Sequence, residues 1–456
     1  TNAMLDDADY YREEVDSVSH PTLYKLDGAW RPVLRSTDTI LVKNSLPVVL
    51  TTYATHRGPI INRLEAAAGF STALLSMRWT GSETSQEPRA FYLINRAGSW
   101  PQFLEGLRYF NAPAQNFVYA DIDGNIGYHM AGFTPLRNNR SGNLPLPGWT
   151  SRFDWSGFVP FDELPQIFNP AQGFVVTANN KIVGDQYPYY LSSYWEPEWR
   201  SRRISEVLAD SLPVRVEDTQ RLQLDVFSTE ARAIVPVILA AFPDASRESD
   251  DVKTALLYLR NWNCRLHAED VASSVFEAFL VSATERTLRD ELGEELMGLF
   301  DTLAMPPLRF MSAQLAKDSS IWFDDVTTPE PEGKNDVVRM ALRDALEYLR
   351  KRLGGELKEW RWGRLHEAEF RHLFGTQGLL RSIFNVGPVG TGGSHATVNN
   401  GYFPFRRPFA HQVGASMRMV VDFSEPASIL MVLPPGQSGH VYHRNYDDQL
   451  TLWKSG

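Results

Sequence analysis

Cysteine is almost missing from this chain, since Cys264 is the one thiol among 456 residues. A single cysteine excludes a disulfide within the chain. It does not fix the compartment, because one thiol is compatible with both the cytosol and the periplasm.

Positive charge is also scarce. The chain carries 45 Lys and Arg against 55 Asp and Glu, a formal net charge of −10. A nucleic-acid-binding surface needs clustered basic residues, so nucleic acid is not an expected partner. Apolar runs of membrane-spanning length are missing too, and no membrane contact is expected. No signal-peptide pattern opens the chain, which carries no information because the N-terminus of the precursor is expected to lie outside this sequence.

Hydrophobic residues make up 43% of the chain, which is also long enough to form a sizeable core. Residues 1–198 read as a β-rich part, because short alternating apolar runs separated by turn residues extend from Leu23 to Gly184. Residues 199–357 read as a helical lobe, with apolar residues at three- and four-residue spacing. Residues 358–456 return to strands. A sheet completed by distant segments around an inserted lobe fits this order.

Local signals refine these regions. The turn Asp123–Asn125 predicts a hairpin between two strands. Asp251 and Asp336 stand where helix N-caps are expected. The apolar runs 417–423 and 428–434 predict buried strands.

The stretch 173–200 is the most informative part of the chain. Phe174–Thr177 has strand composition and runs into the adjacent amides Asn179 and Asn180. A carboxamide at the end of a rigid strand is a fixed hydrogen-bond donor that could stabilise an oxyanion. Such a pair is more often a turn, because Asn tolerates left-handed backbone, so both interpretations stay open here.

Six further blocks accompany this stretch, and their order and spacing are distinctive. They are Tyr119 to Arg137, Leu144 to Trp149, Asp154 to Pro165, Trp360 to His372, Gly392 to Asn399 and Pro434 to Trp453. Together they closely resemble the large (β) chain of the penicillin acylase family of N-terminal nucleophile hydrolases. The resemblance covers essentially the whole chain. It implies an α+β chain from a four-layer αββα sandwich with an inserted helical lobe.

The resemblance also implies an activity, the hydrolysis of linear amides by a free N-terminal Ser whose own amine acts as the base. That Ser is released when the precursor excises a spacer between a small (α) and a large chain. In the family the segment that starts here at Thr1 lies several dozen residues after the Ser. We therefore expect a fragment, inactive by itself, whose partners are the small chain and the N-terminal part of the large chain.

Substrate and compartment follow only from the family. Candidate substrates are small-molecule amides: β-lactam side-chain amides, N-acyl homoserine lactones and other N-acyl amines. A periplasmic or extracellular location is implied, and no organic cofactor. The alternative to an enzyme is a binding module that derives from this family and has lost catalytic activity.

The resemblance assigns roles to individual residues. Asn179 matches the side-chain oxyanion donor, and Asn2 contributes a backbone N–H to the same oxyanion hole. Arg200 matches a cation that keeps the Ser amine unprotonated. The alternative is an Arg on a solvated helix face without a catalytic role. Trp79 matches an aromatic residue near the acyl pocket. An N-terminal Thr1 acting as nucleophile is the competing hypothesis.

The acidic opening of the chain suggests a metal site. Several carboxylates close together on a loop suit Ca²⁺, and a solvated acidic turn is the alternative. By resemblance, Asp6 and Asp9 fall where the family places Ca²⁺ ligands, with a backbone carbonyl near Ala8. The family's later Asp ligand falls near Leu191, where this chain has no carboxylate. A carbonyl near Gly142 could contribute instead.

Overall fold

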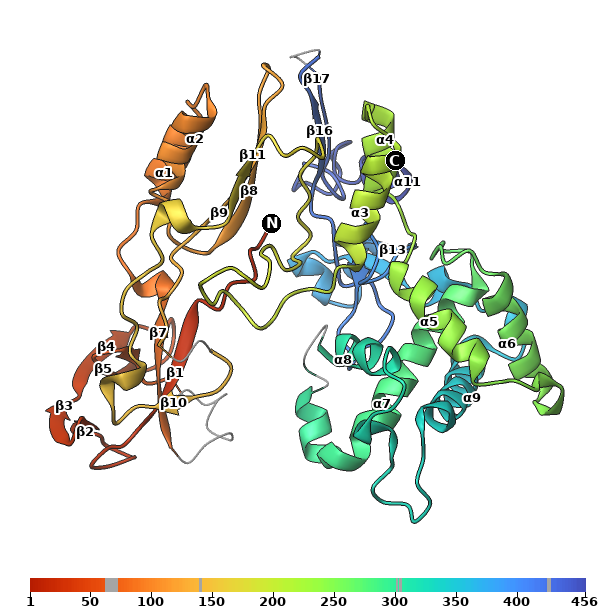
Figure 1. Cartoon of the computed structure of the whole chain (residues 1–456), viewed down its shortest axis with the longest axis horizontal. Coiled ribbons are helices and arrows are strands. Elements are labelled where there is room, and N and C mark those ends of the chain that lie inside the picture. The colour runs from red at the N-terminus through yellow and green to blue at the C-terminus, as the bar shows by residue number, and fades with distance from the viewer. Residues whose placement is uncertain (62–72, 139–141, 301, 303–305, 425–427) are drawn as a thin grey trace. The chain divides into compact units, whose positions relative to one another are not determined.

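The computed structural model describes residues 1–61, 73–138, 142–300, 302, 306–424 and 428–456. The chain divides into two compact units, Thr1–Pro197 and Glu198–Gly456 (Figure 1). Strands dominate the first unit and long helices the second, which confirms the α+β class. The three-part division at 198 and 357 and the four-layer stacking stay predictions.

The first unit is built from short sheets. Its strands are β1 (Ala8–Glu13), β2 (Leu23–Leu26), β3 (Ala29–Pro32), β4 (Leu34–Ile40), β5 (Val48–Thr55), β6 (Gly58–Pro59), β7 (Leu74–Trp79), β8 (Gln115–Ala120), β9 (Ile126–Ala131), β10 (Leu146–Pro147) and β11 (Gln166–Phe168). The sheets have the orders β10-β1-β7, β11-β9-β8, β4-β5-β6 and β2-β3. The described part of this unit also contains two α-helices, α1 (Glu87–Ile94) and α2 (Trp100–Leu107).

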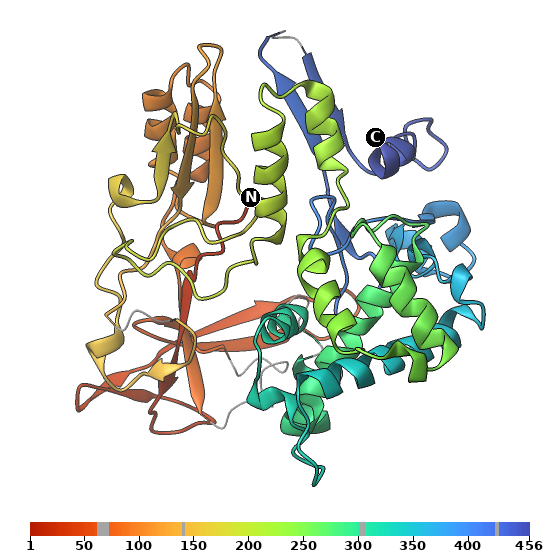
Figure 2. The ribbon, with the colours of Figure 1, turned by 45° about the vertical axis from the view of Figure 1, so that its right-hand side comes forward.

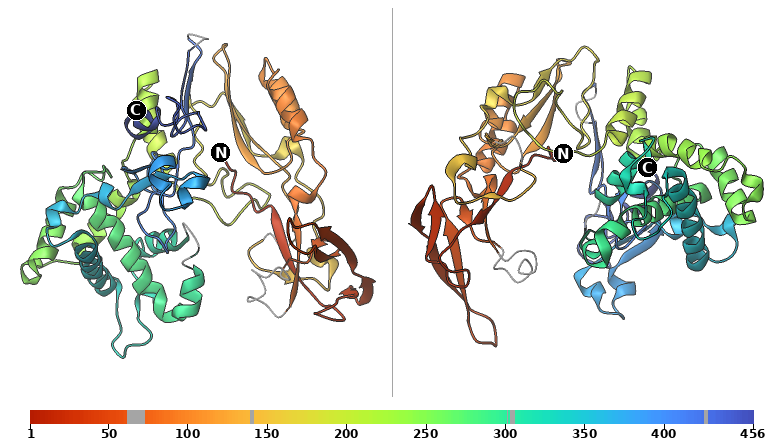
Figure 3. Two further views of the ribbon diagram at one scale, coloured as in Figure 1. Left: turned by 180° about the vertical axis from the view of Figure 1, so that it is seen from behind. Right: turned by 60° about the horizontal axis from the view of Figure 1, so that its bottom comes forward.

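The β8–β9 hairpin is the element that matters for the site. The turn at Asp123–Asn125 joins its strands as predicted, and Gly124 supplies the left-handed backbone with φ +83°. One face of the hairpin packs against α1 and α2, which lie on the same side in Figures 1 and 3. Phe103 of α2 contacts Tyr119 of β8 with ring centroids 5.2 Å apart. Because side chains alternate along a strand, Asn116 and Tyr128 belong to the opposite face.

One prediction for the first unit is wrong, and another is incomplete. Helices α1 and α2 lie within the region that was expected to be β-rich, and neither helix was expected. The segment Phe174–Thr177 forms no ladder with any described residue, although its composition favours a strand. Strand composition records a tendency to pack on a pleated surface, and a strand forms only where a neighbouring edge is available.

The second unit contains helices of very different length. They are α3 (Trp199–Asp210), α4 (Val216–Gln223), α5 (Thr229–Ala240), α6 (Asp250–Asn261), α7 (Val271–Phe300), α8 (Pro306–Leu315), α9 (Lys334–Leu353), α10 (Arg381–Phe384) and α11 (Leu450–Ser455). The predicted helical periodicity is confirmed for α3, α5, α6, α7 and α9. Gly293, at φ 66°, interrupts α7 with a kink. None of the helices in the described ranges combines the length and apolar character that crossing a bilayer requires.

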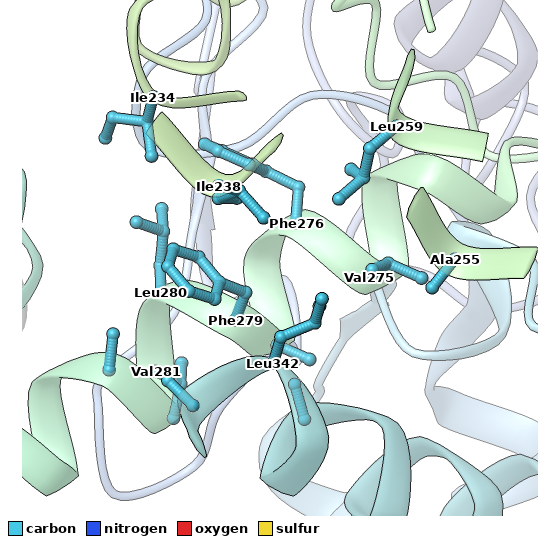
Figure 4. Close-up of a cluster of buried hydrophobic side chains, with 14 of the residues drawn as sticks. Ile234, Ile238, Ala255, Leu259, Val275, Phe276, Phe279, Leu280, Val281 and Leu342 are labelled. Atoms are coloured by element: carbon cyan, nitrogen blue, oxygen red, sulfur yellow. The ribbon is translucent and has the colours of Figure 1, made fainter. Parts of the chain in front are cut away.

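Helices α5, α6, α7 and α9 share one hydrophobic core. Ile238, Phe276 and Phe279 are fully buried there and Leu342 of α9 closes it, as Figure 4 shows. Each fully buried side chain of this size is worth about 1.5–3 kcal/mol relative to exposure. This packing explains why the periodic signal was strong enough to locate these helices from sequence.

The N-caps predicted from sequence are each displaced by two or three residues. Ser249, not Asp251, caps α6, with its hydroxyl accepting from the N–H of Val252. Gly333, not Asp336, is the N-cap of α9. Asp336 lies in the first turn and accepts from the Gly333 N–H instead. A carboxylate in the first turn also faces the positive end of the helix dipole, so sequence alone distinguishes these positions poorly.

Strands of the second unit are short. They are β12 (Glu367–Phe370), β13 (Val386–Gly390), β14 (Gly401–Tyr402), β15 (Val413–Gly414), β16 (Arg418–Asp422) and β17 (Ser428–Val432). The apolar β16–β17 pair was expected to be buried, which is wrong, because Met419 is 45% and Ile429 57% exposed. The pair forms a separate two-stranded sheet (Figure 2, blue strands at the top). Its apolar composition is typical of a sheet that is covered on both faces. The described residues nevertheless leave much of its surface accessible to solvent.

A column of ring contacts joins distant segments of the second unit. His366 is stacked on Trp362 at 4.6 Å and on His411 at 4.7 Å, and His411 contacts Trp453 at 5.6 Å. Thr391 Oγ1 lies 2.8 Å from His411 Nδ1. Burial lowers the pKa of His411 to about 4 and holds the pKa of His366 well below its ordinary value. Both rings are therefore neutral near pH 7.

Candidate active site

Residues 1–3 extend the β8–β9–β11 sheet at the free edge of β8. The N–H of Asn116 donates to the Thr1 carbonyl at 2.7 Å, and the N–H of Ala3 donates to the Ala114 carbonyl at 3.2 Å. In an antiparallel pair these bonds alternate along the chain. The N–H and C=O of Asn2, the residue between them, therefore point to the opposite edge.

Asn179 reaches this edge. Its Nδ2 donates to the Asn2 carbonyl oxygen at 3.0 Å, so the structure brings together two of the residues assigned to the oxyanion hole. Asn179 itself adopts left-handed backbone with φ 64°, so this one residue combines the turn conformation with a donor side chain. The Asn180 side chain accepts from the Ala178 N–H at 3.1 Å, and the Glu196 N–H donates to the Asn179 carbonyl at 2.9 Å. These bonds fix the bend that presents the Asn179 carboxamide.

Two neighbours of Asn2 were not identified from sequence. Asn116 Nδ2 also donates to the Asn2 carbonyl at 3.0 Å, and the Tyr128 hydroxyl donates to Asn116 Oδ1 at 2.7 Å. Both side chains are buried, and burial raises the pKa of Tyr128, so its hydroxyl stays protonated. The sequence feature that could have identified Asn116 is a polar side chain at an inward-facing position of a predicted strand. Beside them, Thr1 Oγ1 lies 2.5 Å from Thr177 Oγ1.

The other two assigned residues belong to other elements. Arg200 is half-buried in the first turn of α3, in the second unit, and its role stays a prediction. Trp79 ends β7 with 41% of its surface exposed. Its indole N–H donates to a carboxylate oxygen of Asp7 at 3.2 Å, and its place in an acyl pocket also stays a prediction.

The predicted calcium residues surround a guanidinium. Arg137 Nε donates to Asp9 Oδ2 at 2.7 Å, and Arg137 Nη2 donates to the Asp6 carbonyl at 2.6 Å. Trp155 donates to the same Asp9 oxygen. Burial raises the pKa of Asp9, against the opposing effect of Arg137. The Asp6 carboxylate accepts from the Ser192 hydroxyl at 2.9 Å.

These residues fit a cation in part. Asp9 Oδ1 is buried and has no hydrogen-bond partner among the described residues, so it could ligate an oxygen-seeking ion. Arg137 already supplies a positive charge to Asp9. The described ranges contain no group of three or more His, Cys, Asp or Glu side chains arranged to hold a metal ion. Calcium therefore stays a prediction that rests on Asp6, Asp9 and a carbonyl near Ala8.

A second buried polar group lies in the helical unit. His395 Nε2 is 3.0 Å from Glu230 Oε2 and His395 Nδ1 is 3.9 Å from Glu277 Oε2, with all three side chains buried. The Ser312 hydroxyl donates to Glu230 at 2.5 Å. Burial raises the pKa of Glu277 to about 7, and His395 opposes that rise. Trp199 makes an edge contact with His395 at 5.5 Å.

Comparison with known proteins gives a consistent result. The family model described as penicillin amidase matches residues 1–456. An acyl-homoserine lactone acylase, QuiP, from Pseudomonas fluorescens is 28% identical over 100% of this chain and 56% of its own length. The penicillin acylase 2 proenzyme of Pseudomonas sp. (strain SE83) is 27% identical over 99% of this chain and 57% of its own length.

A solved structure supports the fold. Thermostable penicillin G acylase from Alcaligenes faecalis matches with a TM-score of 0.69 and 21% identity, over 100% of this chain and 84% of that chain. This likeness speaks for the fold alone. The chain spans a little over half the length of the curated relatives it matches.

Proposed function

The chain belongs to the penicillin amidase family, and from this membership we propose that it forms part of an acylase that hydrolyses linear amides through an acyl-enzyme. The observation that carries the proposal is the 3.0 Å contact between Asn179 Nδ2 and the Asn2 carbonyl. It supports the proposal because the N–H and the carbonyl of one extended residue point to the same strand edge.

In this proposal Asn179 and Asn2 stabilise one oxyanion. An amide nitrogen carries two N–H groups, so Asn179 can bond the Asn2 carbonyl with one and offer the other to substrate. The Asn2 N–H is the second donor. Donors held by bonded backbone need little reorganisation as charge develops on the substrate oxygen, and each is worth roughly 10²–10³ in kcat.

The nucleophile belongs to the part of the relatives' length that this chain does not span. A Ser hydroxyl would attack the amide carbon, and its proton would pass through the Ser amine to the leaving amine. Water would then hydrolyse the ester. Arg200 would disfavour protonation of that amine. Without the Ser segment, and without a small (α) chain, this polypeptide alone would be inactive.

The first substrate class to test is N-acyl homoserine lactones, because several relatives carry that activity in their names. Side-chain amides of β-lactams are the alternative, after the penicillin acylases among the relatives. Trp79 would line the acyl pocket. A Ca²⁺ held by Asp6, Asp9 and the carbonyl near Ala8 would be structural. The four-layer αββα stacking and a periplasmic or extracellular location belong to the same proposal.

The test is to assay the complete processed protein with an N-acyl homoserine lactone, a penicillin and a chromogenic anilide of matched acyl chain. We expect release of the amine and, by mass spectrometry after rapid acid quench, an acyl group on the N-terminal Ser. Amide cleavage without any acyl-enzyme would contradict the mechanism. Tight binding of all three without cleavage would favour the non-catalytic binding module.

A further inference from the structure

Asn116 contacts both peptide groups that flank Asn2. Its main-chain N–H donates to the Thr1 carbonyl at 2.7 Å, and its side-chain Nδ2 donates to the Asn2 carbonyl at 3.0 Å. Because a peptide group is planar, holding the Thr1 carbonyl also sets the direction of the Asn2 N–H in the same plane. One residue therefore orients the N–H on one side of Asn2 and the carbonyl on the other.

The carbonyl of Asn2 is shared by two amides. Asn116 and Asn179 each donate to it at 3.0 Å. A carbonyl oxygen has two lone pairs, so the two donors can bind together. The position of the Asn179 carboxamide thus depends on an oxygen that Asn116 also holds.

Tyr128 determines which way the Asn116 amide faces. Its hydroxyl lies 2.7 Å from Asn116 Oδ1, and Asn116 and Tyr128 are only 6% and 7% exposed. With the amide reversed, Asn116 Oδ1 would face the Asn2 carbonyl, two acceptors without a proton between them. The Tyr128 hydroxyl satisfies Oδ1 and leaves Nδ2 toward Asn2. Both residues lie on the face of the β8–β9 hairpin away from α1 and α2.

The geometry points to Asn116, held by Tyr128, as the positioning residue of the oxyanion hole, acting on substrate only through Asn2 and Asn179. This inference rests on the proposed function. It adds a pair of buried residues that touch neither the reacting atoms nor the acyl chain. Their effect should appear in the transition state, because the developing oxyanion is the group whose donors they align.

The experiment uses the complete processed protein and the variants Tyr128→Phe, Asn116→Ala, their double mutant and Asn179→Ala. Tyr119→Phe is the matched control. It also removes a bonded hydroxyl from the same hairpin, since the Tyr119 hydroxyl donates to Asp121 at 2.8 Å, but on the opposite face. The readouts are kcat and KM for one chromogenic amide, the affinity for a boronic acid that mimics the tetrahedral intermediate, and thermal stability.

We expect Tyr128→Phe to lower kcat roughly three- to tenfold, the size of one neutral hydrogen bond, with KM nearly unchanged. Boronate affinity should fall by the same factor, and Tyr119→Phe should change neither. Since Tyr128 acts through Asn116, adding Tyr128→Phe to Asn116→Ala should have no further effect on kcat. If Tyr128 were only structural, its substitution would lower thermal stability, and its effect on kcat would not depend on Asn116.

Three results would overturn the inference. Unchanged kcat and boronate affinity in both Tyr128→Phe and Asn116→Ala, while Asn179→Ala lowers kcat, would remove the positioning role and leave the proposed function intact. Full kcat in Asn179→Ala would remove the oxyanion hole itself, and the positioning role with it. Additive losses in the double mutant would also contradict it, because they would separate Tyr128 from Asn116.

Discussion

Replacing Glu277 by Gln should make the helical unit more stable at alkaline pH and leave it unchanged at acidic pH. Glu277 is fully buried on α7, and its carboxylate lies 3.9 Å from His395 Nδ1. Glu230 of α5 faces the same His395, and Ser394 lies beside it on the connecting loop. Glutamine keeps the shape of the side chain and removes its charge.

The magnitude follows from the pKa. Burial raises the pKa of Glu277 from 4.5 to about 7. The folded protein therefore keeps a proton that the unfolded chain releases, and stability falls as pH rises between these two values. At about 1.36 kcal/mol per pKa unit, the fall reaches about 3 kcal/mol. This loss of stability is complete above the folded pKa and absent below pH 4.5. The Glu277→Gln substitution removes it.

The assay is urea unfolding of the complete protein at several pH values, followed by far-ultraviolet circular dichroism, to which the helices of the second unit contribute most. The stability of Glu277→Gln relative to the natural protein should rise with pH through the neutral range. Glu347→Gln, on the exposed face of α9, is the control and should show no such rise. A difference between Glu277→Gln and the natural protein that is the same at acidic and alkaline pH would refute the reasoning.

Three other outcomes are expected. His411, whose pKa burial lowers to about 4, should cost up to about 3 kcal/mol of stability as pH falls from 6.5 to 4, and His411→Asn should flatten that part of the pH profile. Gly132→Ala should lower the melting temperature more than Gly157→Ala, because both have φ near +140° but only the Gly132 Cβ would lie 2.6 Å from Ala114. Ca²⁺ should bind, by isothermal titration calorimetry, to the complete protein and not to Asp9→Asn, and equal binding by both would remove the predicted site.

The helices of the second unit were predictable because burial imposes a period that the sequence records. Helix α9 shows this well, with Val338, Leu342 and Leu349 all fully buried along one face. Helices α1 and α2 are only eight residues each, and both begin near a proline, so they left little periodic signal among strands. Exposure of the β16–β17 pair was unpredictable, since composition cannot reveal whether a covering layer is present.

The candidate site was predictable in part. Asn2 and Asn179 are 177 positions apart, and only the family resemblance joined them before the structure did. Asn116 and Tyr128 were missed because their role depends on strand register, which sets Asn116 beside residues 1–3 and Tyr128 on the same face. Sequence alone does not give the pairing of a strand with a segment more than a hundred residues away.

The most direct test of the account is the kcat of Asn179→Ala in the complete processed protein with a chromogenic amide. We predict a fall of roughly 10²–10³ with little change in KM, because one oxyanion donor is lost and ground-state binding is retained. The isolated chain should show no turnover. An unchanged kcat would contradict the central claim, as would turnover by the isolated chain that disappears in Thr1→Val, which would make Thr1 the nucleophile.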